Sequence, residues 1–219
     1  MPEASAEEFG VVAGKLHATG LNLISRDWQP AQLQIIDAAV ERFSQVLGSA
    51  RVVHIATGGV RMERTPQGGG LTYGFWILPW WKRIVLGDPE FQQEPAWRGQ
   101  VAVVHELGHA WDAQTAPVWV RVFNGAGRIV NAMSAFVGEE PGPTCYGGLM
   151  GPDCHFARVP REEWAESVAA YVFPEYTEWL RANLPAERDA GLRPKHKAFV
   201  EKQIEAVRKM VANDESQRA

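Results

Sequence analysis

His105, Glu106 and His109 form a His-Glu-x-x-His sequence, in which residue types and spacing together indicate metal chemistry. On a helix, residues four positions apart lie about 40° apart around the axis, so both imidazoles can reach one metal ion. Catalytic zinc takes three protein ligands of this kind and keeps one position for water. Glu106 lies about 100° from His105 around the same axis, which leaves it free to act as a general base toward that water. The pattern predicts zinc-assisted hydrolysis.

The residues around this pattern predict a helix that can hold it. No proline interrupts residues 98–116, and Pro117 ends the segment, as expected because proline is disfavoured inside a helix. The side expected to face the core carries Val101, Val104, Gly108 and Trp111. Two solvated histidines on an ordinary helix are the alternative, and the apolar neighbours of His105 argue against it.

A third zinc ligand is predicted on a second helix, between Pro160 and Pro174. Proline in the first turn, with Glu162 and Glu163 beside it, is typical of a helix start. Glu166 is the only acidic residue in the segment 165–173. An ionised carboxylate in so apolar a segment costs free energy unless it is paired or bound to metal. We therefore predict Glu166 as the third ligand.

Other interpretations of this helix stay open. Glu163, one turn before Glu166, is a competing ligand, and His155 in the preceding loop would give a three-histidine site. Glu166 could also lie on a solvated face or pair with a core arginine. The small residues beside it would let a second helix approach closely: Ala165, Ala169 and Ala170.

Asp112 belongs to the same face as the two histidines, three positions after His109. Metal-bound imidazoles commonly donate their second N–H to a carboxylate, and Asp112 could accept it. The alternative is an acid near the helix C-terminus that pairs with an arginine. The sequence leaves both interpretations open.

The composition of the chain limits the class of protein and the kinds of partner. The chain has 219 residues, of which 46% are hydrophobic and 22% charged, which is ordinary for a globular protein. Its formal net charge is -4, with 22 Lys and Arg against 26 Asp and Glu, and no basic cluster stands out. This balance argues against nucleic acid as the main partner. No apolar run is long enough to predict a membrane span. The partner expected from the His-Glu-x-x-His pattern is a peptide or protein substrate.

Two features bear on the cellular compartment. Residues 1–8 are acidic and lack the basic and apolar regions of a signal peptide, which favours a cytoplasmic protein. Cys145 and Cys154 are separated by glycines and a proline, so the loop between them could close into a disulfide. A disulfide would indicate a secreted protein, whereas two free thiols fit the cytoplasm.

The remaining segments predict a single domain over residues 1–219, in the order helix, strands, zinc-binding helix, long connection and further helices. Residues 1–26 are expected as an N-terminal extension, 27–117 as the helix, the sheet and the zinc-binding helix, and 118–219 as a long loop with C-terminal helices. The predicted strands are 51–56, 71–78 and 84–86, and the other predicted helices run from about 27 to Gly48 and over 175–184 and 195–211. The aromatic run 75–81 fits a buried strand or a substrate-contacting edge.

The octet HELGHAWD at 105–112 and the sextet EEWAES at 162–167 resemble the gluzincin metallopeptidases, most closely those similar to the catalytic domain of anthrax lethal factor. The resemblance covers residues 52–173. It implies an α+β, zincin-like metalloprotease fold, with a small mixed sheet packed on the HExxH helix and a helical C-terminal part. It also implies zinc bound by His105, His109 and Glu166, with Glu106 as the base.

One position departs from that family. The family places a tyrosine about two turns before the ligand glutamate, where it steadies the oxyanion, and this chain has Val159 there. Tyr146 and His155, in the preceding loop, are the predicted catalytic donors in its place.

The sequence therefore predicts a zinc-dependent metallopeptidase in which Glu106 is the general base. One alternative is a zinc hydrolase of a non-protein amide, whose site would have the same chemistry. The other is a non-catalytic zinc-binding domain, in which a residue such as Asp153 or His155 would fill the position of the water.

Overall fold

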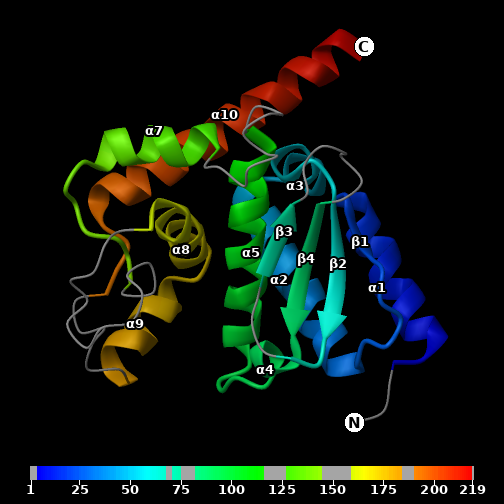
Figure 1. Cartoon of the computed structure of the whole chain (residues 1–219). Helices are drawn as coiled ribbons and strands as arrows, with labels where there is room; N and C mark the ends of the chain where they lie inside the picture. The colour runs from blue at the N-terminus through cyan, green and yellow to red at the C-terminus, as the bar shows by residue number, and fades with distance from the viewer. Residues whose placement is uncertain are drawn as a thin grey trace.

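The computed structural model describes residues 4–67, 71–74, 82–115, 127–144, 159–183 and 190–218 of the chain. These residues form a mixed α+β structure that is mostly helical and contains a small sheet (Figure 1). The helices are α1 (Ala6–Ala18), α2 (Pro30–Leu47), α3 (Ala50–Thr57), α4 (Asp88–Phe91), α5 (Trp97–Thr115), α7 (Arg128–Val137), α8 (Pro160–Val172), α9 (Pro174–Asn183) and α10 (Pro194–Arg218). The strands are β1 (Leu21–Leu23), β2 (Val60–Thr65), β3 (Leu71–Gly74) and β4 (Lys82–Gly87).

The described strands form one sheet in the order β1-β2-β4-β3. Strands β1, β2 and β4 run parallel, with Leu21 opposite Val60 and Met62 opposite Ile84. Strand β3 pairs antiparallel with β4 and forms one edge of this sheet, next to α5 (Figure 1). The mixed sheet expected from the sequence is thus present, with its antiparallel edge toward the helix that carries the two histidines.

Helix α2 forms where the sequence predicts it and provides much of the core beneath α5. Pro30 occupies its first turn, and Gly48 ends it with a φ of 107°, a left-handed conformation that glycine adopts without strain. Its buried side follows helical spacing and carries Leu33, Ile36, Val40, Phe43 and Leu47. This face packs against α5, where the Phe43 ring meets the ring of Trp111 at a centroid distance of 6.3 Å.

The prediction of a strand at 51–56 is wrong, because this segment is helix α3. The Ser49 hydroxyl accepts a hydrogen bond from the Val52 N–H and so caps the start of the helix. Gly58 ends the helix with a φ of 66°. The branched residues 52 and 53 favour a strand locally, but capping and the burial of one helical face outweigh that preference. The strand of this region is β2, which follows α3.

Helix α7 lies inside the segment that the sequence predicted as a long connection. Asp112, at the end of α5, fixes the start of α7, since its carboxylate accepts hydrogen bonds from the N–H groups of Gly127 and Val130 at 2.7 and 2.9 Å. A side chain at position 127 would collide with Asp112, because a Cβ there would lie 2.2 Å from the Asp112 carbonyl oxygen. Burial raises the pKa of Asp112 even though these N–H groups oppose the shift. Asp112 therefore acts as an N-terminal cap for another helix.

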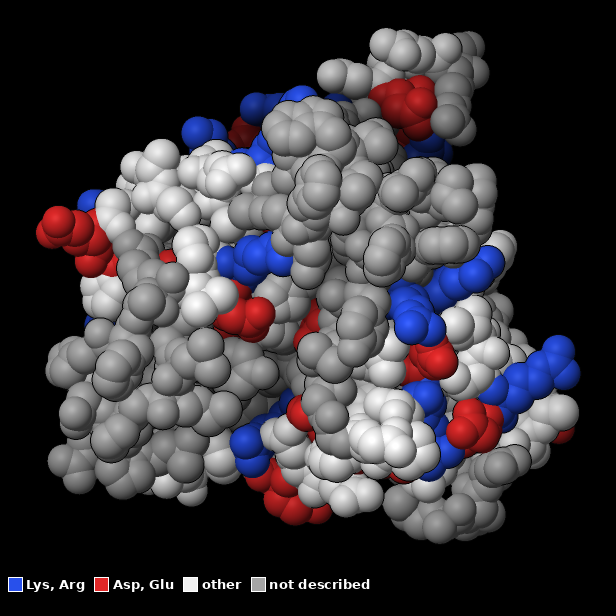
Figure 2. All heavy atoms as spheres, in the orientation of Figure 1, with Lys and Arg blue, Asp and Glu red and all other residues white. Residues whose placement is uncertain are grey.

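The C-terminal part is helical, as predicted. Helix α10 begins at Pro194, lies beside α7, and contacts α8 and α3 along its length (Figure 1). Its last turns project from the rest of the molecule (Figure 1). On the face shown in Figure 2, acidic and basic side chains of the described residues are interspersed. None of the described helices is both long enough and apolar enough to cross a membrane.

Some predicted features lie outside the described residues. These are the aromatic run 75–81, the cysteine pair Cys145 and Cys154, and the two candidate catalytic donors Tyr146 and His155.

Candidate metal centre

Helices α5 and α8 approach closely at a pair of small residues, and this contact places the candidate ligands opposite one another. A Cβ added at Gly108 would lie 3.0 Å from the Cα of Ala165, so a larger residue would push the two helices apart by a few tenths of an ångström. The indole N–H of Trp164 donates to the Gly108 carbonyl at 2.8 Å, which fixes how the two helices lie along each other. The close approach expected from the small residues of the second helix is confirmed.

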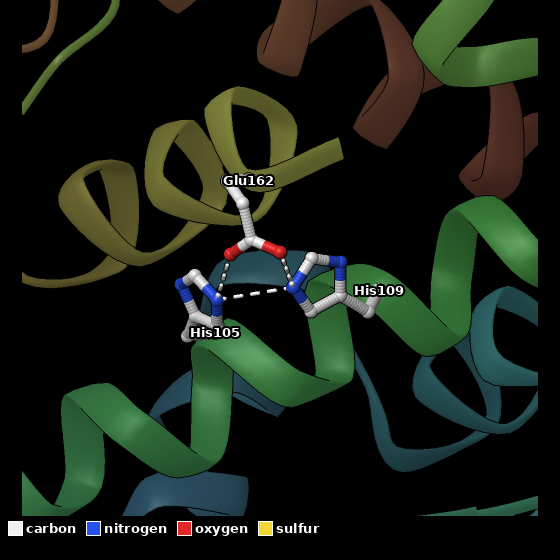
Figure 3. A group of neighbouring side chains, drawn as sticks. All are labelled: His105, His109 and Glu162. Atoms are coloured by element: carbon white, nitrogen blue, oxygen red, sulfur yellow. Dashed lines mark hydrogen bonds and ion pairs between the residues drawn. The ribbon is translucent and has the colours of Figure 1, made fainter. Parts of the chain in front are cut away.

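His105, His109 and Glu162 converge on one point between the two helices. Figure 3 shows the Glu162 carboxylate reaching from α8 toward both imidazoles of α5. The Nε2 atoms of His105 and His109 are 3.0 Å apart. The Glu162 Oε2 lies 3.1 Å from the His105 Nε2, and the Glu162 Oε1 lies 3.4 Å from the His109 Nε2. These residues form a group that could hold a metal ion.

The spacing of these atoms fits a small tetrahedral cation. Zinc bonds nitrogen and oxygen ligands at about 2.0–2.2 Å, which places tetrahedral ligand atoms about 3.3 Å from one another. The two imidazole nitrogens are 3.0 Å apart, and the two Glu162 oxygens lie 3.1 and 3.4 Å from one of these nitrogens each, which is close to that value. Two imidazoles and one carboxylate are also a ligand set that catalytic zinc accepts.

Glu166 contacts the other nitrogen of His105. Its Oε1 lies 3.2 Å from the His105 Nδ1, and its side chain is only 5% exposed. Its Oε2 is buried and has no hydrogen-bond partner in the described part of the chain. A buried carboxylate with one unpartnered oxygen is costly unless a positive charge lies close by, so its position favours a cation in the group formed by His105, His109 and Glu162.

The electrostatics of the site also favour a positive charge. Burial lowers the pKa of His105, but its bonds to Glu162 and Glu166 outweigh burial and raise that pKa to about 10. Burial raises the pKa of Glu162, but the two histidines outweigh it and hold that pKa well below its usual range. Without metal, a proton on His105 supplies the positive charge that the carboxylates require. A metal ion would take the place of that proton.

Zinc binding at pH 7 is therefore expected to release about one proton, because a ligating imidazole nitrogen must be deprotonated. The pKa of His105 in the metal-free protein is about 10, so the imidazole is protonated at pH 7. Since zinc and the proton compete for one nitrogen, zinc affinity should rise as the pH increases toward 10. Calorimetric titration at pH 7 in two buffers of different ionisation enthalpy measures the release, and zinc uptake with no proton released would contradict this arrangement.

Glu106 lies on α5 between the two histidines and is buried, with 5% of its surface exposed. Its charge contributes to the raised pKa of His105, which places the carboxylate near the candidate metal site. It also affects Glu90 of α4, whose pKa is raised first by burial and then by the charge of Glu106. Helix α4 thus adds a second acidic group to the surroundings of Glu106.

Of the residues predicted from the sequence, the structure brings together His105, His109 and Glu166, with Glu106 beside them. It adds Glu162, which is not among the ligands predicted from the sequence. The spacing of Glu162 and Glu166 could have revealed it, because residues four apart on a helix share a face. Glu163, the competing ligand from α8, is instead bonded to His196 of α10.

Comparisons with protein-family models, with curated proteins and with solved structures find no match to this chain.

Proposed function

We propose that the protein is a zinc-dependent peptidase in which His105, His109 and Glu162 bind the metal and Glu106 is the general base. The observation that carries the proposal is the convergence of the Glu162 carboxylate of α8 on the Nε2 atoms of His105 and His109. Both histidines lie on α5, the helix that also holds the buried Glu106. The α+β arrangement of a small mixed sheet beside α5, with helices after it, supports a zincin-like fold as part of the same proposal.

The zinc, when bound, polarises the scissile carbonyl and lowers the pKa of a water molecule toward neutrality. Glu106 takes a proton from the attacking water and then gives it to the leaving nitrogen, which balances the proton transfer over the reaction. Glu166 accepts the Nδ1–H of His105, keeps the Nε2 directed toward Glu162, and fixes the tautomer that can ligate. In this proposal Glu166 therefore orients the ligand His105 and does not itself contact the metal.

Strand β3 suggests how a peptide would lie along this site. It forms an edge of the described sheet, and it contacts α5. An extended peptide can add to such an edge through backbone hydrogen bonds, which position the chain whatever its side chains are. This arrangement favours a peptide over a compact non-protein amide, which has no backbone to pair with β3.

Cleavage of a peptide library tests this function. The zinc-loaded protein is expected to cut peptides of several residues, to lose that activity on chelation, and to regain it when zinc is restored. Short N-acyl amides that cannot reach β3 are the control and should be cut far more slowly. Cleavage of those amides with all longer peptides left intact would instead assign a non-protein amide hydrolase, and no cleavage of either class would contradict the proposed catalysis.

A further inference from the structure

A second polar group lies on a different side of α8 from the candidate metal site. His196, near the start of α10, is fully buried, and both of its ring nitrogens face carboxylates. Its Nε2 lies 2.6 Å from an oxygen of Glu163, and its Nδ1 lies 3.0 Å from an oxygen of Glu140. Glu140 also accepts hydrogen bonds from the backbone N–H groups of Lys195 and His196. We call Glu140, His196 and Glu163 the α10 latch.

The geometry of the α10 latch does not suit a metal ion. The two carboxylates lie on opposite nitrogens of one imidazole, so their oxygens point toward the ring from two sides and do not converge on a common point. The imidazole lies between the two carboxylates, with one ring nitrogen against each. The imidazole ring is rigid, so its contact with Glu140 fixes the direction of the ring nitrogen that faces Glu163. The α10 latch therefore restricts the position of the Glu163 side chain.

Glu163 directly follows the candidate ligand Glu162 in the first turn of α8. Neighbouring residues on a helix point about 100° apart, so fixing one side chain fixes the direction of the other. Glu162 lies toward α5 and Glu163 toward α10, with α8 between them. The bond to His196 therefore sets the rotation of the helix turn that carries Glu162.

We infer that His196 is a positioning residue for the metal site, which acts through Glu163 to hold Glu162 against His105 and His109. This inference rests on the proposed function, since it concerns the same metal. It assigns α10 a role in metal affinity, although no described residue of that helix belongs to the group formed by His105, His109 and Glu162. Partners that orient metal ligands are commonly worth about 10–100-fold in affinity, which sets the size of the expected effect.

The test needs a variant that removes the latch and still folds. His196→Ala alone would remove a hydrogen-bond partner of the buried Glu163 carboxylate, which is strongly destabilising. The double variant His196→Phe with Glu163→Leu replaces the buried imidazole and the buried carboxylate with apolar groups, a replacement that is often neutral or stabilising. Glu140 would keep its backbone donors and is partly exposed. We expect this variant to melt near the wild-type temperature and to bind zinc about tenfold more weakly.

Arg208→Ala is the matched control, because it loosens the same helix at a distant point. Arg208 donates to the carbonyls of Leu47 and Val46 at 2.8 Å, about 18 Å along α10 from His196. This variant should lower the melting temperature and leave zinc affinity unchanged. Weaker zinc binding in Arg208→Ala would mean that affinity follows overall stability, and it would overturn the inference.

Zinc titration of the three proteins separates the possible outcomes. Unchanged zinc affinity in the double variant would overturn the positioning role of His196 and leave the proposed function standing. Failure of the wild-type chain to bind zinc would overturn both. A tenfold weaker affinity in the double variant, with a near wild-type melting temperature and an unaffected Arg208→Ala control, is the result that the latch predicts.

Discussion

Replacement of Glu106 with glutamine is expected to leave zinc bound and to lower turnover by at least about 10²-fold, the usual scale of general-base catalysis. Glutamine has nearly the shape of glutamate, so the buried position on α5 stays filled. An amide, however, cannot take a proton from the attacking water. Because Glu106 is not one of the three converging ligands, zinc content should stay at the wild-type level.

Glu90→Gln is the matched control for this loss of charge. Glu90 of α4 is a partly buried acid whose pKa responds to Glu106, yet it lies on a different element from the ligand histidines. We expect the Glu90 variant to retain most of the turnover, measured as initial cleavage rates at saturating peptide. Wild-type turnover in Glu106→Gln would rule out the catalytic mechanism proposed here.

Glu162→Ala is expected to weaken zinc binding by more than ~100-fold, which is more than the replacement of any other acidic residue of α8. It removes one of the three proposed protein ligands, whereas a residue that only orients a ligand is worth about 10–100-fold. Glu166→Ala belongs to that second class, because Glu166 contacts the Nδ1 of His105 and not the nitrogen that faces the cluster. Competitive titration against a chromophoric chelator gives the affinity of each variant.

An exposed acid on α9, Glu178, provides the control for the change in charge. Glu178→Ala removes one negative charge from the chain and should leave zinc affinity at the wild-type value. If Glu166→Ala were the weakest binder and Glu162→Ala close to wild type, the ligand set would revert to the one predicted from the sequence. In that arrangement Glu162 would be only a neighbour of the site.

The sequence predicts the helices of the site well, because local signals define them. Prolines bound the segments that become α5 and α8, and the buried face of α5 follows helical spacing. The small residues of α8 predict that another helix can approach closely, and the contact at Gly108 is that approach. A sequence shows which helices can pack closely, but it does not show which two helices pack together. Helix α7 was missed because its N-terminal cap, Asp112, belongs to another helix.

The third ligand shows where sequence reasoning reaches its limit. The sequence predicts Glu166 because an acid in an apolar segment needs a partner, and Glu166 is indeed buried, with its Oε1 3.2 Å from the His105 Nδ1. The same argument cannot tell a ligand from a residue that orients a ligand, because both are buried acids beside a histidine. Glu162 lies one turn earlier among the charged residues of a helix start, where an acid needs no special explanation. Only the position of α8 against α5 separates the two roles.

The zinc content of the purified chain tests the central claim most directly. Elemental analysis after dialysis against metal-free buffer is expected to find about one zinc per wild-type chain. It should find almost none in His105→Ala or His109→Ala, each of which lacks a nitrogen from the converging group. No zinc in the wild-type protein, or full occupancy in both histidine variants, would contradict the metal site described here.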